Sequence, residues 1–331
     1  MEIKETIGID VSKLTLDAHI HSNRQSTVFE NSEKGFAKLV KWAYANSPHS
    51  KDHILFIFEH TGLYSERLSE HLSKEGISYS IVSGLEIKRS LGIVRGKDDR
   101  IDAARIALYG YRLRDEVTLF KSPSRTIRTL KKLLSLRERL IRQRAGYKAS
   151  IKEQKKVLGQ KDFKLLFKVQ EKMIRELTVH IDALDLEMEA NIKSESELDR
   201  IFSLLLSIKC IGKQAAMLLL VYTEGFTKFK SARQFAAYCG IAPYPHQSGS
   251  SIRGKSRVSQ MANKSIKSLL NMCALSSIRH DAEIKGYYEQ RVASGKNKMS
   301  TVNIVRNKLV SRAFAVVHRG TPYVNVYKHA S

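Results

Sequence analysis

The sequence predicts an α/β domain at the N-terminus, a pair of long helices in the middle and a mainly helical C-terminal domain. Three observations lead to this prediction. Strand-like and helical runs alternate in residues 1–118, apolar residues recur in steps of three and four through residues 119–197, and helical patterns dominate residues 198–331. A chain of 331 residues is long enough for two or three domains with cores of their own.

The N-terminal elements follow from the spacing of their apolar residues. Short β-branched runs predict strands, and apolar residues at helical spacing predict helices. In order, we expect strands at Thr6–Val11, Leu14–His21 and Gln25–Glu30, a helix at Lys34–Ala45, a strand at Ile54–Glu59, a helix at Tyr64–Lys74, a strand at Ile77–Val82 and a helix at Asp98–Leu113. This order fits a ribonuclease-H-like sheet, in which a metal site forms where the first strand, the fourth strand and the final helix meet.

Residues 119–197 predict two long helices that form a hairpin or a coiled coil, with a break between Gly159 and Asp162. From Lys121 to Lys156 the chain has 13 Lys and Arg against two acids. A coiled coil alone would mix both charges along its flanks, so we expect this segment to contact nucleic acid. A basic face that is merely solvated is the alternative. The candidate contact residues are Arg128, Lys131, Lys132, Arg139 and Arg142.

The C-terminal domain opens with two helical runs, Leu204–Ile211 and Gln214–Tyr222, on either side of Gly212. They resemble a helix-hairpin-helix, whose backbone N–H groups can bind phosphate. A helix pair that only packs the domain is equally consistent with this pattern. From Ser251 to Arg319 there are 14 Lys and Arg against three acids, which favours further phosphate contacts.

The charge of the whole chain narrows its class of partner. The formal net charge is +24 and the sequence pI is about 9.9, which suits nucleic acid or an anionic membrane surface. No apolar run approaches the roughly 18 residues that span a bilayer, and the first residues do not resemble a signal peptide. Nucleic acid is therefore the favoured partner, ahead of a membrane surface. The three cysteines have no metal-binding spacing. We therefore expect reduced thiols in a cytoplasmic protein with no membrane partner.

Four carboxylates have the pattern of a divalent-metal site. Asp10 and Glu59 lie in or just after apolar strands, and Asp99 and Asp102 are three residues apart on one face of a helix. A buried carboxylate is costly unless a cation compensates its charge. Mg²⁺ prefers oxygen ligands, so these acids predict a Mg²⁺ or Mn²⁺ site that acts on phosphodiesters. For Asp99 and Asp102 the alternative is that they are there only because the helix dipole favours acids at a helix N-terminus.

A segment rich in Gly, Pro and Ser, residues 240–257, predicts a flexible loop with hydroxyl groups beside cations. Three basic residues, Arg253, Lys255 and Arg257, follow its serines. Such a loop suits phosphate contact or a hydroxyl that attacks phosphorus, and an ordinary surface loop is the alternative.

Four segments together resemble a known family. IGIDVSK, FEHTG, KDDRIDAARIA and GIAPYPHQSGSSIRGKSRVS are similar, in order and over nearly the whole chain, to the DEDD insertion-sequence transposases. These are bridge-RNA-guided recombinases related to the Piv-type DNA invertases. The resemblance implies a RuvC-like catalytic domain at 1–118, a coiled-coil linker at 119–197 and a transposase domain at 198–331. It assigns Asp10, Glu59, Asp99 and Asp102 to the metal-binding acids, and Ser248 to the nucleophile, with Ser250 and Ser251 close by.

The resemblance also implies a bacterial protein that associates with the nucleoid when active, and it implies partners. We expect donor and target DNA, a structured bridge RNA that pairs with both, and a homo-oligomer, either a dimer or a tetramer, whose active site forms within or between protomers. In such a scheme the protein reads the shape of the RNA while base pairing reads the sequence.

Three functions follow from these residues. The first is a recombinase in which the acids and Ser248 act together through a transient protein–DNA bond. The second is a Holliday-junction-type endonuclease that uses only the acids and water. The third is a non-catalytic nucleic-acid scaffold in which the acids are structural. The first accounts for both the acids and the serine segment.

Overall fold

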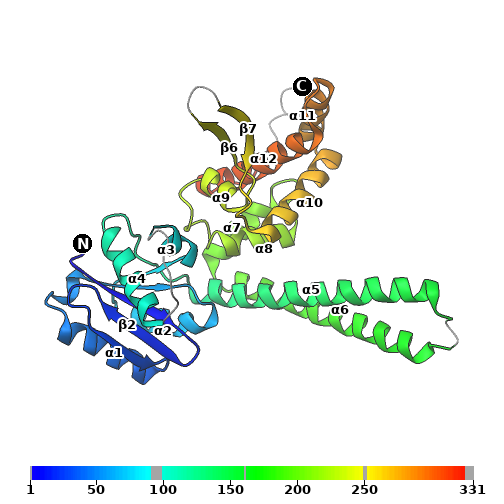
Figure 1. Ribbon diagram of the computed structural model, residues 1–331. Coiled ribbons are helices and arrows are strands. Elements are labelled where there is room, and N and C mark those ends of the chain that lie inside the picture. Colours follow the sequence, from blue (N-terminus) through cyan, green and yellow to red (C-terminus); the bar gives the residue numbers. More distant parts are fainter. Residues whose placement is uncertain (1, 91–98, 160–161, 249–251, 325–331) are drawn as a thin grey trace. The chain divides into compact units, whose positions relative to one another are not determined.

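The computed structural model of the chain describes residues 2–90, 99–159, 162–248 and 252–324 (Figure 1). Two compact units divide the chain, one from Met1 to Ser122 and one from Pro123 to Ser331, and each is described by itself. We call them the N-terminal unit and the C-terminal unit. The division of residues 123–331 into a linker and a transposase domain stays a prediction.

The N-terminal unit is built on a five-stranded mixed sheet in the order β3-β2-β1-β4-β5. The strands are β1 (Glu5–Val11), β2 (Thr15–Ile20), β3 (Ser26–Glu30), β4 (Ile54–Glu59) and β5 (Tyr79–Val82). Antiparallel pairing joins β1, β2 and β3, whereas β4 runs parallel to both β1 and β5. This topology is consistent with the ribonuclease-H-like sheet that the sequence predicts.

Helices cover both faces of this sheet (Figure 1). One face packs against α1 (Glu33–Asn46) and α2 (Leu63–Lys74) through a core that includes Ile7, Ile9, Phe56 and Phe58. The other face packs against α4 (Asp99–Arg112), where Ile57 meets Ile106 and Tyr109. Because β1 and β4 are buried on both faces, they read as continuous apolar runs rather than alternating ones. The helix α3 (Gly84–Ser90), which the sequence analysis did not predict, joins the second core through Ile87.

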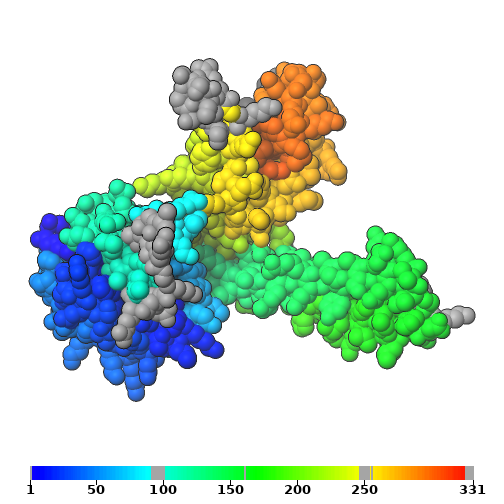
Figure 2. Space-filling view, in the orientation of Figure 1, coloured from blue at the N-terminus to red at the C-terminus, as the bar shows by residue number. Residues whose placement is uncertain are grey.

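The C-terminal unit begins with the two long helices that the sequence predicts, α5 (Arg125–Val157) and α6 (Lys164–Lys193). They run antiparallel, since Arg137 pairs with Asp185 and Lys155 with Glu171. Figure 2 shows them as one continuous body of packed side chains. Ser124 begins α5 by accepting a hydrogen bond from the Ile127 N–H, a standard N-cap.

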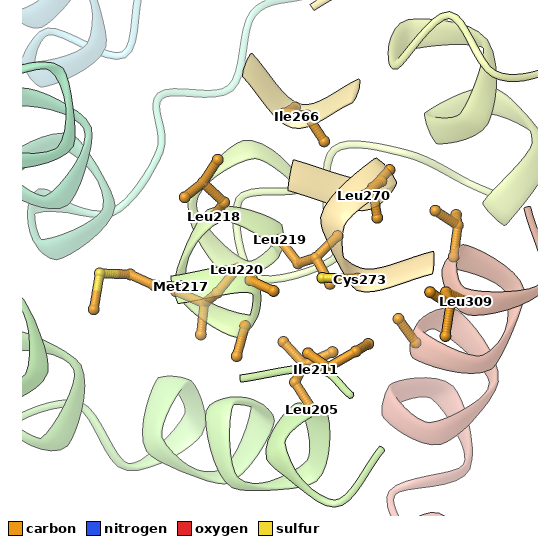
Figure 3. Close-up of a cluster of buried hydrophobic side chains, with 14 of the residues drawn as sticks. Leu205, Ile211, Met217, Leu218, Leu219, Leu220, Ile266, Leu270, Cys273 and Leu309 are labelled. Atoms are coloured by element: carbon orange, nitrogen blue, oxygen red, sulfur yellow. The ribbon is translucent and has the colours of Figure 1, made fainter. Parts of the chain in front are cut away.

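The rest of the C-terminal unit is mainly helical. Its helices are α7 (Ser196–Leu206), α8 (Lys213–Tyr222), α9 (Ala232–Tyr238), α10 (Lys264–His280), α11 (Ala282–Ala293) and α12 (Lys298–Arg319). The helix α8 is buried on nearly every side, and Leu218, Leu219 and Leu220 pack among side chains of α7, α10 and α12 (Figure 3). Cys239 and Cys273 are buried in this core as free thiols, in line with the expectation of reduced cysteines.

One expectation about this unit was wrong. The segment expected to be a flexible loop is a β-ribbon of two antiparallel strands, β6 (Pro243–Ser248) and β7 (Ile252–Val258). Pro243 and Pro245 made β6 read as a loop, yet proline is tolerated on an edge strand and at irregular pairings. The pairing shifts register between Tyr244 and His246, on either side of Pro245.

Candidate active site

A glycine on β1 brings α4 close to the sheet. A Cβ atom at Gly8 would lie 2.2 Å from the carbonyl oxygen of Ala103 and 2.3 Å from the backbone N of Ala107, far inside contact distance. The hydroxyl of Thr6 donates to the carbonyl of Ala107 at 2.8 Å, on the same face of β1. Only glycine permits this approach, and it places the first turns of α4 over the C-terminal end of β1.

Asp10 and Glu59 lie on neighbouring parallel strands, at the ends where both strands finish. The last paired positions are Ile9 and Phe58, and each acid follows by one residue. Side chains alternate along a strand, so both acids lie on the face that α4 covers. Both are half-buried. The carboxylate of Glu59 also lies against Gly84, where a Cβ would come within 2.1 Å of it.

The helix α4 carries the other two predicted acids. Asp102 precedes Ala103 and accepts a hydrogen bond from Arg105 Nη1 at 2.8 Å, which partly neutralises it. Asp99 is the first residue of α4, one turn before Asp102, and its side chain lies outside the described atoms. Lys97 and Asp98 lie outside the described residues.

The sequence analysis missed one further acid, Asp17. It pairs directly with Asp10 across β1 and β2, so the two carboxylates share a face of the sheet. Two like charges in direct opposition are unfavourable unless a positive charge lies beside them. Nothing in the sequence marks Asp17 until the hairpin register of β1 and β2 is known.

The donor set of this edge suits a hard divalent cation. Its candidate ligands are all carboxylates, and oxygen donors are those that Mg²⁺ and Mn²⁺ prefer. Among the described residues, no three His, Cys, Asp or Glu side chains come close enough together to hold a metal ion. The described part of the edge therefore brings Asp10 and Glu59 to one place and α4 over them, without a closed ligand cage.

Ser248 is the last residue of β6 and pairs with Ile252, so it stands at the end of the ribbon where the chain turns. Its side chain, and those of Arg253 and Lys255 on β7, lie outside the described atoms, and Ser250 and Ser251 lie outside the described residues. Arg257, near the other end of β7, is exposed.

The predicted nucleic-acid residues of α5 divide into two groups. Arg128, Lys132, Arg139 and Arg142 follow helical spacing along one face, and the last three are exposed. Lys131 instead donates to Glu224 at 2.7 Å, so it links α5 to the segment after α8. With 12 Lys and Arg against two acids, α5 is strongly basic, whereas α6 has five against six.

Comparisons with known proteins decide the family. Residues 7–158 match a family model for DEDD transposases of IS110 type, and residues 202–289 match the transposase IS116/IS110/IS902 family. The pilin gene-inverting protein of Moraxella bovis is 32% identical over 327 residues, 97% of this chain and 98% of that protein. The chain belongs to the IS110-type DEDD transposase family.

Other relatives agree with this membership. The pilin gene-inverting protein of Moraxella lacunata matches over the same length at 32% identity. An uncharacterised 43.6 kDa protein of the insertion element IS110 from Streptomyces coelicolor is 29% identical over 136 residues, 41% of this chain and 33% of that protein. As a member of the IS110-type family, the chain is an enzyme of DNA transposition or recombination with DNA as its partner, and the family name points to dependence on a divalent metal. In the parts that the structure describes, no helix combines the length and apolarity needed to cross a membrane.

Proposed function

We propose that this chain cuts and rejoins DNA strands with two sets of groups. Asp10, Glu59, Asp99 and Asp102 hold Mg²⁺ or Mn²⁺ beside the scissile phosphate, and Ser248 is the nucleophile. The observation that carries the metal half is the position of Asp10 and Glu59 at the ends of adjacent parallel strands, beneath a helix drawn in by Gly8. Membership of the IS110-type family supports the proposal that these acids and a serine nucleophile act in the same reaction.

The proposed reaction conserves bond energy in two transfers. The Ser248 hydroxyl loses its proton and its oxygen bonds to phosphorus, while the bond to a deoxyribose oxygen breaks and that oxygen takes up a proton. A hydroxyl of a second strand then loses its proton and its oxygen bonds to phosphorus, while the bond from phosphorus to the Ser248 oxygen breaks and that oxygen takes up a proton. A divalent cation bound by the acids would withdraw charge from the phosphate oxygens. Inversion of a DNA segment is one outcome of this exchange, supported by the pilin gene-inverting relatives.

We further propose that a structured guide RNA selects the DNA. Exposed basic residues along one face of α5 support a backbone-reading surface, because phosphate contacts hold a nucleic acid without reading its bases. The residues proposed for this surface are Arg128, Lys132, Arg139 and Arg142, with Arg253, Lys255 and Arg257 of the ribbon. RNA that copurifies with the chain and is released by ribonuclease, together with its sequence, tests this step.

A homo-oligomer is the proposed working form. The outer side of α6 exposes four apolar residues, Leu165, Val169, Val179 and Leu186, each at least 51% exposed, with the Lys172–Glu176 ion pair between Val169 and Val179. Exposed apolar residues and a paired ion on a nearly neutral helix suit a second copy of the chain better than a polyanion. Sedimentation of the wild-type chain and of a Val179→Glu/Leu186→Glu variant tests it, and an unchanged oligomer in the variant contradicts it.

The decisive experiment is to trap the protein–DNA bond. The wild-type chain, incubated with Mg²⁺, guide RNA and labelled DNA, is expected to form a covalent adduct that survives denaturation, and Ser248→Ala is expected to form none. Ser256→Ala, on β7 of the same ribbon, is the matched control and keeps the adduct. A Ser248→Ala chain that recombines DNA at the wild-type rate contradicts the proposal for this residue.

The same experiment separates the two other functions. An endonuclease that uses only the acids and water would give free 5′-phosphate and 3′-hydroxyl ends, no adduct and no dependence on Ser248. A non-catalytic scaffold would show no metal-dependent change in DNA, and an Asp10→Asn/Asp102→Asn variant would match the wild type in every assay.

A further inference from the structure

The β6–β7 ribbon stands on its own as a sheet. Among the strands that the structure describes, β6 and β7 pair only with each other, and the five-stranded sheet belongs to the N-terminal unit. A lone two-stranded hairpin is only marginally stable in water. The direction of the ribbon, and hence the place of Ser248 at its end, therefore depends on how its first and last residues join the helical core.

The first join is a buried backbone carbonyl held by two amides. The chain leaves α9 through Gly240, which has φ +65°, and reaches Ile241, which is fully buried two residues before β6. The Ile241 carbonyl accepts hydrogen bonds from Asn303 Nδ2 at 2.8 Å and from Asn307 Nδ2 at 3.0 Å. Both asparagines lie on α12, one turn apart.

A buried arginine holds one of these amides in place. Arg306, only 7% exposed, donates from Nη1 to Asn303 Oδ1 at 3.3 Å and from Nη2 to Asn271 Oδ1 of α10 at 2.5 Å. Its Nε has no hydrogen-bond partner within the described residues, and burial lowers the pKa of its guanidinium. A guanidinium buried against neutral amides is costly. It fixes Asn303 with its oxygen toward Arg306 and its N–H groups toward Ile241.

The second join ties the far end of the ribbon to the same segment. After β7, the backbone N–H of Asn263 donates to the Tyr238 carbonyl at 3.0 Å, and Asn263 Nδ2 donates to the Tyr238 hydroxyl at 3.3 Å. A Cβ at Gly240 would lie 2.3 Å from the Cβ of Ala262, so the two legs of the ribbon touch at their base. Both ends of the ribbon are thus held at one place, where they contact each other and where α12 binds the Ile241 carbonyl.

We propose that Asn303 and Asn307, with Arg306 behind them, are positioning residues that aim the ribbon and so place the Ser248 nucleophile for attack. This inference rests on the proposed role of Ser248. The three residues lie at the base of the ribbon and not at its Ser248 end, so in this proposal they act through the ribbon. Their contribution lies in the orientation of the ribbon, so losing them lowers the rate of attack more than the binding of DNA.

The test replaces one N–H donor without removing volume. In Asn303→Asp the carboxylate gains an ion pair with Arg306 but turns an oxygen, not an N–H, toward the Ile241 carbonyl. Global stability should therefore stay or rise while the ribbon base loosens. Asn307→Ala removes the second donor on the same helix. Asn191→Asp on α6 is the control, because Asn191 Nδ2 also donates to a backbone carbonyl, that of Glu187 at 2.8 Å, but this bond stays within α6 and lies far along the chain from the ribbon.

Three experiments on the full-length chain are compared: adduct kinetics, thermal unfolding and amide hydrogen exchange. With saturating DNA, the rate of adduct formation in Asn303→Asp and Asn307→Ala is expected to fall at least about tenfold, while the DNA concentration for half-maximal rate changes less than about twofold. The thermal midpoint of Asn303→Asp should not fall. Amide hydrogen exchange within residues 252–258 of the free protein should accelerate about fivefold or more. Asn191→Asp should match the wild type in all three.

Each contrary result has a separate meaning. If the wild type forms an adduct and both variants form it at the wild-type rate, the positioning inference is overturned while the proposed function stands. It is also overturned if the rate falls only in variants whose thermal midpoint falls. If the wild type forms no adduct at all, the proposed function fails. The exchange measurement then decides about the ribbon base by itself, since unchanged exchange in Asn303→Asp shows that these residues do not hold it.

Discussion

The two units of the molecule differ sharply in charge. The N-terminal unit has 18 Lys and Arg against 17 Asp and Glu, whereas the C-terminal unit has 39 against 16, so nearly all of the +24 lies in the second. The predicted acids are in the balanced unit and the basic helix is in the other. In the proposed function, the metal-binding acids therefore lie in the balanced unit, whereas Ser248 and most of the charge that attracts nucleic acid lie in the basic unit.

The units also hold their proposed catalytic groups differently. Asp10 is the last residue but one of β1 and Glu59 is the last residue of β4, and the neighbouring residues of both strands are buried, so the sheet itself fixes the two acids. Ser248 ends an edge strand of a two-stranded ribbon, fixed only at its base. In the proposed reaction, the positions of the two acids therefore depend on the sheet, whereas the position of Ser248 depends on the contacts at the base of the ribbon.

The largest effect is expected from Asp10→Asn. The substitution removes one of the four carboxylates proposed to bind the metal ion. The rate of strand cleavage should therefore fall by about 10³-fold, as it does when a group that stabilises transition-state charge is lost. DNA affinity, measured by filter binding in Mg²⁺, should change less than about twofold, because nearly all of the excess positive charge lies in the other unit. Asp52→Asn, an exposed acid of the same unit, is the control. A parallel loss of affinity and cleavage in Asp10→Asn would break the division between the units.

Gly8→Ala should destabilise the N-terminal unit strongly. Its Cβ meets two backbone atoms of α4 that cannot rotate away, so we expect a loss of about 3 kcal/mol or more in the free energy of unfolding. In Gly146→Ala, on α5, the new Cβ meets nothing within 4 Å, and better helix propensity should stabilise by about 0.5–1 kcal/mol.

Tryptophan and cysteine side chains allow the unfolding of each unit to be followed separately. The single tryptophan, Trp42, is in the N-terminal unit, and all three cysteines are in the C-terminal unit. Burial raises the pKa of Cys239 to about 12 and that of Cys273 to about 11, so at pH 8 both stay protonated and unreactive until their unit unfolds. In Gly8→Ala, the tryptophan transition in urea should shift to lower concentration while thiol labelling of Cys239 and Cys273 does not. Coincident shifts would show that the units unfold together.

The smallest effect is expected from the basic face of α5. Arg139→Ala/Arg142→Ala should weaken binding to RNA and DNA by about tenfold at moderate salt and reduce the salt slope of log K by about two. Lys168→Ala/Arg175→Ala removes equal charge from exposed positions of the nearly neutral α6 and should change binding little. Equal losses from the two helices would mean that net charge alone, not the face of α5, holds the nucleic acid.

Local sequence patterns were enough to predict most of the fold. The strands of the N-terminal sheet are apolar and β-branched, and α5 and α6 are long and periodic. The local sequence therefore predicts the bounds of these elements within a few residues. The ribbon was missed because its pairing depends on a partner strand, IRGKSRV, that is basic and has no alternating pattern. A strand of this kind is recognised only from its neighbour.

The candidate site was predicted in part for a similar reason. Asp10 and Glu59 stand out because acids that end apolar strands are unusual. Asp17 does not, since its relation to Asp10 exists only in the register of the hairpin. Asn303 and Asn307 carry no signal at all, because an asparagine on a helix gains meaning only from the Ile241 carbonyl that folding brings to it.

The prolines of β6 have a consequence for the protein in concentrated solution. A two-stranded ribbon has two open edges, and an open edge invites strands of other molecules to add to it. Pro243 and Pro245 remove two of the six backbone N–H groups of β6, and three of the seven residues of β7 are basic. Both features discourage intermolecular strand addition. The ribbon can therefore keep two unpaired edges without promoting aggregation of the protein through added strands.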